Sequence, residues 1–220
     1  MLFERIEKPV YAIMFGAIAP VALFLTGWWV MVPFTKNGNI FLLTSLSGLA
    51  AGLLISWRYA PAFVRKAYDV PPYCLIAVYG FYSVCLLGFF MGVPVFNITL
   101  GLPAGFYAAM KCAKGGKDRS YITRTAVLTT VFMLFVCAVS AVIALRDPYT
   151  ARNLQGMLRP GFEITNSMVL ALIVIGGMFL VAAQYWLTAL TGKYVLGKMG
   201  GGHLSCAKIF ADGDRNLYNF

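Results

Sequence analysis

The sequence predicts an all-α fold: a polytopic membrane protein that forms a six-helix transmembrane bundle with both its N-terminus and its C-terminus in the cytoplasm. Three observations predict this class: the composition, the long uncharged stretches and the placement of the bases. The 220 residues are 60% hydrophobic and 12% charged, with a mean hydropathy of +0.76. A soluble domain carries about a quarter charged residues. The composition therefore excludes a disordered chain, a collagen-like chain and a nucleic-acid-binding domain.

The uncharged stretches set the number of helices. Four of the five have the length of one span, because a bilayer-crossing helix needs about 20 mostly apolar residues. The third would reach roughly 60 Å as one helix, about twice the hydrocarbon thickness. We expect it to fold as two spans with a turn at residues 91–97, where Gly92, Pro94 and Asn97 cluster. The stretches without Asp, Glu, Lys or Arg are Pro9–Thr35, Asn37–Trp57, Val70–Met110, Thr125–Leu145 and Ile164–Gly192.

The first span is predicted near residues 9–34. Glu4 and Glu7 precede its 27-residue apolar run, and both features are untypical of a signal peptide, so we expect a retained anchor. Trp28 and Trp29 close to its outer end are typical of the aromatic belt at a membrane interface.

The remaining spans are predicted near residues 39–57, 71–91, 96–113, 122–145 and 164–191. With the N-terminus inside, 14 of the 18 Lys and Arg residues fall on the cytoplasmic side. This bias follows the positive-inside rule and favours cytoplasmic termini. The chain then divides into a six-span transmembrane domain, residues 1–192, and a cytoplasmic tail, residues 193–220. Anionic lipid headgroups account for the net charge of +10 without a nucleic-acid partner.

The inventory of reactive side chains predicts no cofactor, no metal site and no catalytic residue. His203 is the single histidine, and its place in the predicted tail excludes a bis-histidine haem inside the bundle. The five cysteines form no C-x-x-C pair and are interpreted as packing residues. No Asp, Glu, Lys or Arg lies in the middle of a span. This absence disfavours a proton-coupled antiporter and a voltage-gated channel.

The spans carry neutral polar residues instead. Their Ser and Thr side chains are expected to form hydrogen bonds between helices. Asn97, Asn166 and Gln184 are costlier to leave unpaired in lipid, and for these three both packing and ligand contact remain open. The Ser and Thr residues concerned include Thr44, Ser45, Ser47, Ser83, Thr99, Thr129, Thr130, Ser167 and Thr188.

Polar groups converge on the predicted outer face, in the outer half of the bundle. The longest outer loop has about 18 residues and links spans five and six, and loops of that length are often functional. Its three arginines would suit a carboxylate or phosphate, although contact with lipid phosphates is the alternative. The candidate ligand-binding residues are Trp28, Trp29, Asn97, Arg146, Arg152, Glu163 and Asn166.

The run from Gly92 to Phe96, Gly-Val-Pro-Val-Phe, precedes a helix with Gly101 and Gly105. This arrangement resembles loop three and helix four in the S components of energy-coupling-factor vitamin transporters. The pattern Ala12-x-x-x-Gly16 is similar to the small-x-x-x-small motif of their first helix, with Gly where Ala is expected. The resemblance concerns the architecture of most of the chain and includes no vitamin-specific signature. It implies a six-helix bundle, a pocket roofed by outer loops and a coupling subunit as partner.

Three functions are compatible with these features. The first is a small-solute binding or uptake subunit that captures a neutral or anionic molecule from outside. The second is a non-catalytic structural or assembly subunit of a membrane complex. The third is a membrane-embedded lipid-modifying enzyme, whose acids would be Asp69, Asp118, Asp212 and Asp214. The expected partners are the lipid bilayer, a small-molecule ligand and a coupling or other membrane subunit. The expected location is the cell membrane, as a multi-pass protein.

Overall fold

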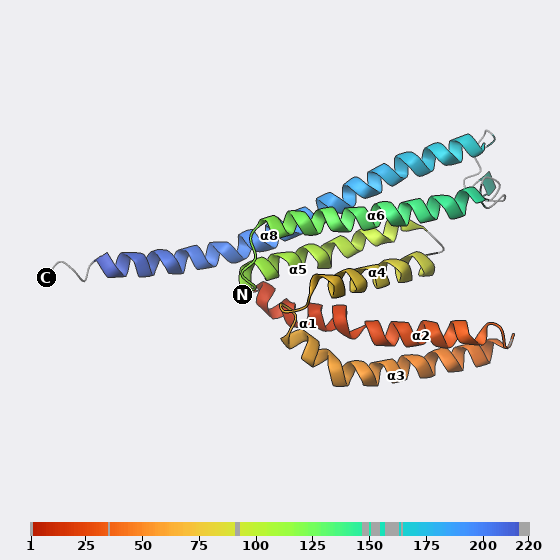
Figure 1. Ribbon diagram of the computed structural model, residues 1–220, viewed down its shortest axis with the longest axis horizontal. Helices are drawn as coiled ribbons and strands as arrows, with labels where there is room; N and C mark the ends of the chain where they lie inside the picture. The colour runs from red at the N-terminus through yellow and green to blue at the C-terminus, as the bar shows by residue number, and fades with distance from the viewer. Residues whose placement is uncertain are drawn as a thin grey trace. The chain divides into compact units, whose positions relative to one another are not determined.

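The structure is a computed structural model that describes residues 2–34, 36–90, 93–146, 150, 155–156, 163 and 165–215, with side chains between residues 5 and 199. The chain divides into two compact units, unit 1 from Met1 to Phe81 and unit 2 from Tyr82 to Phe220. All the regular elements among the described residues are helices (Figure 1). They are α1 (Leu2–Gly16), α2 (Ile18–Met31), α3 (Gly38–Arg65), α4 (Pro72–Phe89), the 3₁₀ helix η1 (Pro94–Leu100), α5 (Gly101–Lys114), α6 (Ser120–Arg146) and α8 (Asn166–Arg215).

Five helical segments of the described chain are long and apolar enough to cross a membrane. Large apolar side chains along them are exposed, as at Leu43 (70%), Phe135 (65%) and Phe179 (71%). Extensive exposed apolar surface of this kind suits a membrane. The predictions of an all-helical chain and of several membrane-length apolar helices are confirmed, whereas six crossings and cytoplasmic termini stay predictions. The five segments are Arg5–Met31, Gly38–Arg65, Pro72–Phe89, Ser120–Arg146 and Asn166–Met199.

In unit 1, α2 and α3 pack closely along a seam of glycines. A Cβ atom added to Gly27 would lie 2.7 Å from the carbonyl oxygen of Thr44, and one added to Gly48 would overlap the carbonyl oxygen of Leu23. These pairings run in opposite directions along the two helices, which are therefore antiparallel. Glycine allows the two backbones to touch.

A proline interrupts the first predicted span, which forms two helices joined at Ala17. Pro20 has no backbone N–H, so the carbonyl of Gly16 lacks the donor that a regular helix would supply. The Ser56 hydroxyl of α3 donates a hydrogen bond to that carbonyl. The neighbouring helix thus satisfies the backbone group that Pro20 releases, which is how proline is tolerated in membrane helices.

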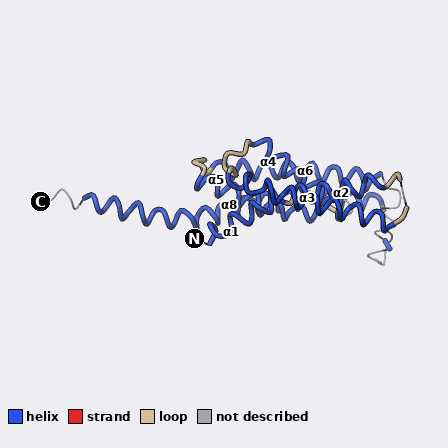
Figure 2. Tube along the Cα trace, turned by 90° about the horizontal axis from the view of Figure 1, so that it is seen from below, coloured by secondary structure: helices blue, strands red, loops and turns tan. Residues whose placement is uncertain are grey.

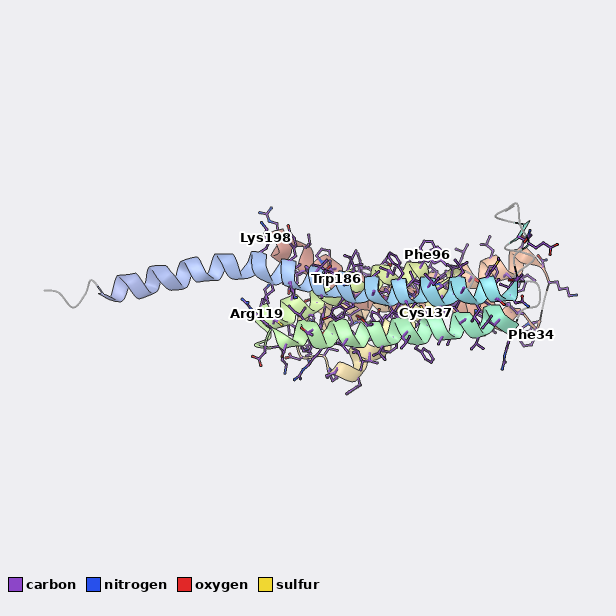
Figure 3. All side chains as sticks on the ribbon, turned by 90° about the horizontal axis from the view of Figure 1, so that it is seen from above. Phe34, Phe96, Arg119, Cys137, Trp186 and Lys198 are labelled. Carbon is purple, nitrogen blue, oxygen red and sulfur yellow. The ribbon has the colours of Figure 1, made fainter. Side chains whose placement is uncertain are left out.

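In unit 2, α5, α6 and α8 pack against one another. Helices α6 and α8 are antiparallel: Thr129 contacts Thr188, and Cys137 lies beside Gly177. Figure 3 accordingly shows Arg119, before α6, and Lys198, late in α8, at the same end of this pair. Helix α8 continues from the sixth predicted span into the predicted tail and ends at Arg215 (Figure 2).

The fourth predicted span, near residues 96–113, consists of η1 followed by α5. Pro103 explains the change of helix type, because it has no N–H to bond to the carbonyl of Thr99 across the junction. The 14 residues of α5 reach only about 21 Å. Together with η1 the segment reaches about 35 Å, which exceeds the hydrocarbon thickness. Because η1 and α5 are two short helices, neither is among the five long helices of the described residues. Together they are nevertheless long enough to cross a bilayer.

Candidate functional site

Unit 2 carries several buried polar side chains on elements that pack against one another. Asn97 lies on η1, and this element packs against α5, α6 and α8. Thr129 lies on α6, whereas Gln184 and Thr188 lie one turn apart on α8. All four side chains are at most 3% exposed. Asn97, Thr129, Gln184 and Thr188, four buried side chains on elements that pack against one another, are called the polar cluster below.

Two glycines of α5 let its backbone reach the polar side chains of α8. A Cβ atom on Gly101 would lie 2.9 Å from Thr188 Oγ1 and 3.2 Å from Gln184 Nε2. One on Gly105 would overlap the carbonyl oxygen of Thr188. Gly101 faces Gln184 and Thr188, and Gly105 faces the next turn of α8, so α5 and α8 run in the same direction. The cluster is thus enclosed by backbone as well as by side chains.

A hydrogen bond between hydroxyl groups joins α6 to α8. Thr129 Oγ1 and Thr188 Oγ1 are 3.2 Å apart. Thr188 Oγ1 is also 2.9 Å from the carbonyl oxygen of Gln184, and Thr129 Oγ1 is 3.0 Å from that of Ala126. Two hydroxyl hydrogens therefore serve three possible hydrogen bonds. The expected helix-to-helix hydrogen bonding is confirmed for this pair.

Other hydroxyl groups in the predicted spans differ from that expectation. Thr44, Ser47, Thr99 and Thr130 each donate to a carbonyl three or four residues earlier in their own helix. A hydroxyl can satisfy itself in this way wherever no neighbouring helix offers an acceptor. The expectation that hydroxyl groups bond between helices is therefore wrong for the hydrogen bonds of these four residues.

The side-chain amide of Asn97 has a hydrogen-bond partner for its nitrogen but not for its oxygen. Its Nδ2 donates to the carbonyl oxygen of Ser83, at 3.3 Å. Its Oδ1 is fully buried and accepts no hydrogen bond from the protein. A buried amide oxygen without a donor costs about 1–3 kcal/mol. Asn97 Oδ1 is consequently a buried polar atom that would gain from a hydrogen-bond donor outside the protein.

A buried lysine follows on α5. Lys111 is 5% exposed, and its Nζ donates to the Tyr107 hydroxyl at 3.3 Å. The ammonium also lies 5.5 Å from the centre of the Tyr107 ring and 5.8 Å from that of Tyr121. Cation–π contacts of this kind gain strength when they are shielded from water. Lys111 is one of the 14 bases that the sequence predicts on the cytoplasmic side, and its spacing of four residues from Tyr107 indicates a shared helix face.

The seven predicted ligand-binding residues occupy different environments. Asn97 is buried, whereas Arg146 ends α6, Glu163 precedes α8 and Asn166 begins α8, and these three are exposed. Arg152 lies outside the described residues.

Trp28 and Trp29 belong to unit 1, on α2, and are 44% and 68% exposed. The seven residues thus belong to two units, and their shared role stays a prediction.

Among the side chains that the structure describes, no group of three or more His, Cys, Asp or Glu residues could hold a metal ion. The polar cluster offers amide and hydroxyl groups without formal charge. Such groups can exchange hydrogen bonds with a neutral solute but supply no strong acid, base or nucleophile.

Comparisons with protein-family models, with curated proteins and with solved structures find no match for this chain.

Proposed function

We propose that the protein is a membrane-embedded subunit that binds a small polar solute at the polar cluster of unit 2. The observation that carries the proposal is Asn97 Oδ1, a buried acceptor to which the protein donates no hydrogen bond. Its setting on a short 3₁₀ helix before α5 adds support, because transporters form ligand sites at interrupted helices. A neutral solute with an N–H or O–H group fits the uncharged cluster.

Gln184, one residue of the proposed site, lies deeper than the outer half that the sequence favours. Gln184 is 18 residues beyond Asn166 on α8, which is about 27 Å along the axis. Lys193, at the predicted cytoplasmic boundary, is only about 14 Å further on. In this proposal the outer residues Arg146 and Glu163 belong to an entrance, and Asn97 belongs to the site itself.

Uptake would need a coupling subunit, as the resemblance to S components implies. In the Ala12-x-x-x-Gly16 pattern, on which that resemblance partly rests, Gly16 already packs against another helix of unit 1. Gly16 is buried, and a Cβ atom on it would lie 3.4 Å from the Cβ of Ala60. Ala12 is exposed. A partner helix would therefore contact α1 at Ala12 rather than at Gly16.

The replacement Asn97→Leu tests the proposal. Leucine has about the volume of asparagine and lacks the unsatisfied acceptor. The unliganded variant should be about as stable as the wild type, because it loses the hydrogen bond to Ser83 but also the cost of burying Oδ1 without a donor. A solute identified by thermal stabilisation of the wild type at a hundred times its Kd should raise Tm by about 5 °C or more. The variant should show no such rise.

Thr99→Val is the matched control, since Thr99 is exposed on the same 3₁₀ helix and bonds only to the carbonyl of Phe96. This control should keep the full shift. If Asn97→Leu retains the shift, or if radiolabelled solute binds both variants equally, the polar cluster is not the binding site.

A structural or assembly role is the second candidate, and one observation favours it. The cluster is held by direct contacts between helices, with Thr129 bonded to Thr188 and Gly101 against both Thr188 and Gln184. In that role the cluster fixes helix register. No compound would then stabilise the wild type, and a stoichiometric partner would co-purify in mild detergent. A lipid-modifying enzyme has no comparable support among the described side chains.

A further inference from the structure

Unit 1 carries exposed bases and aromatic rings near the end of α3. Trp57 is 82% exposed and Tyr59 is 58% exposed. Between them Arg58 places its guanidinium 5.9 Å from the centre of the Tyr59 ring. Arg65 is seven residues after Arg58, so it shares that face of the helix about 10 Å further along. Lys66, also exposed, follows directly.

Helix α1 brings further bases to the same region. The Tyr68 hydroxyl, just after α3, donates a hydrogen bond to Glu7 Oε1. The rings of Tyr68 and Tyr11 meet edge to face, with centroids 6.0 Å apart. These contacts hold the start of α1 beside the end of α3. Arg5 and Lys8, on either side of Glu7, are exposed there.

The described acids of this surface, Glu7 and Asp69, are fewer than its five bases. Glu7 is buried, with Tyr68 as a hydrogen-bond donor. Burial and the bond to Glu7 raise the pKa of Tyr68, so its hydroxyl keeps the proton that it donates. Asp69 is the exposed acid among the described side chains of this region. The basic rim is defined as Arg5, Lys8, Arg58, Arg65 and Lys66, with Trp57 and Tyr59.

We propose that the basic rim binds the headgroups of anionic phospholipids. The membrane is favoured as the occupant because the rim continues directly from an apolar segment: Gly38–Arg65 has the length and composition of a span, and Leu53 and Leu54, one turn before Trp57, are exposed. Arg58, Arg65 and Lys66 pair with lipid phosphates. Trp57 and Tyr59 sit at headgroup depth, where amphipathic rings are favoured.

Lipid quenching of tryptophan fluorescence tests the proposal. Of the 4 tryptophans, only Trp57 is kept, by replacing Trp28, Trp29 and Trp186 with Phe. The protein is placed in nanodiscs of phosphatidylcholine and phosphatidylglycerol, with bromine on the acyl chains of one lipid at a time. At low salt we expect roughly fivefold enrichment of the anionic lipid around Trp57. The enrichment should fall in 0.5 M salt, where charges are screened within about 4 Å.

Two variants show whether the rim causes the enrichment. The triple variant, which combines R58Q, R65Q and K66Q, should lose the preference. The two brominated lipids should then quench Trp57 about equally. A protein that keeps only Trp29, at the opposite end of the antiparallel α2–α3 pair from Trp57, should show weaker enrichment than the Trp57 protein. As a check that does not depend on replacing tryptophans, native mass spectrometry should find less bound phosphatidylglycerol on the triple variant than on the wild type.

Three results would overturn the proposal. Equal quenching of Trp57 by both lipids removes the headgroup preference. Enrichment that survives the triple replacement excludes these bases as its cause. Protection of Trp57 from both lipids means that the rim faces protein, and an acidic partner is then its occupant.

Discussion

Single hydrogen bonds decide how this chain tolerates breaks in its helices. Gly16 offers a carbonyl that Pro20 leaves without a donor, and Ser56 supplies the missing hydrogen bond from α3. At Asn97 one half of the amide is bonded and the other half is not. Polar side chains beside two helix breaks therefore act differently: Ser56 stabilises a kink, whereas Asn97 retains an unused acceptor.

Ser56→Ala should destabilise unit 1, because it removes the donor to the Gly16 carbonyl and leaves that group unpaired in an apolar medium. Hydrogen bonds between membrane helices contribute about 0.6 kcal/mol on average, with a maximum of about 1.7. Because the replacement would leave the Gly16 carbonyl without a donor, we expect a loss near the maximum of about 1.7 kcal/mol. The free energy of unfolding in mixed micelles, measured by titration with a denaturing detergent, checks the value.

Ser47→Ala is the control for this measurement, since Ser47 donates only to the Thr44 carbonyl of its own helix. It should change the free energy of unfolding by a few tenths of a kcal/mol. Equal losses for the two variants would mean that the bond from Ser56 adds nothing to the stability of the kink.

At the scale of elements, the uncharged stretches predict where the helices lie but not where they break. Helix α3 covers its predicted span, and α6 covers the fifth. The first span divides at Ala17 and the fourth changes from 3₁₀ to α at Gly101. Proline at 20 and 103 signals a disturbance in each, but its outcome depends on whether a neighbouring helix compensates, and single-chain periodicity carries no such information.

Helix packing in unit 1 depends on the glycine seam. A Cβ atom on Gly52 would lie 2.6 Å from the nitrogen of Pro20 and 2.7 Å from the carbonyl oxygen of Ala19. These are backbone atoms and cannot rotate away. Gly52→Ala should therefore separate α2 from α3 and cost about 1–3 kcal/mol, measured as a fall in Tm of the detergent-solubilised protein.

Gly176→Ala provides the opposite case on α8. No atom lies within 4 Å of a Cβ at Gly176, and alanine favours the helix over glycine by up to about 1 kcal/mol. Its Tm should stay level or rise. A fall for Gly176→Ala as large as that for Gly52→Ala would show that glycine flexibility, rather than close packing, sets the stability.

At the scale of the whole molecule, the composition predicts that the chain folds in a membrane. It predicts little of how the polar cluster is assembled. Asn97 and Gln184 stand out in the sequence because lipid penalises unpaired amides. The pairing of Thr129 with Thr188 joins residues 59 positions apart, and it follows from the register of α6 on α8. Register depends on shape complementarity along both helices, so no local pattern in one segment predicts it.

The number of crossings decides the sidedness of both termini, and the η1–α5 segment decides the number. Its reach of about 35 Å is sufficient for the bilayer. If it crosses, the loop at Lys117 lies on the same side as both termini and opposite to Lys36. If it turns back, Lys117 and the C-terminus lie opposite to the N-terminus. We expect a crossing, because 14 of the 18 bases then share one side.

Single cysteines at positions 36 and 117, introduced into a variant whose own five cysteines are serine, test this arrangement with a membrane-impermeant maleimide. In right-side-out vesicles only Lys36→Cys should be labelled, and Lys117→Cys should react only after the membrane is opened. Tags at the two ends should behave like position 117. Labelling of both cysteines from outside would mean that η1–α5 does not cross. The position assigned to Gln184, nearer the cytoplasmic face, would then reverse, because it rests on α8 running from the outer face inward.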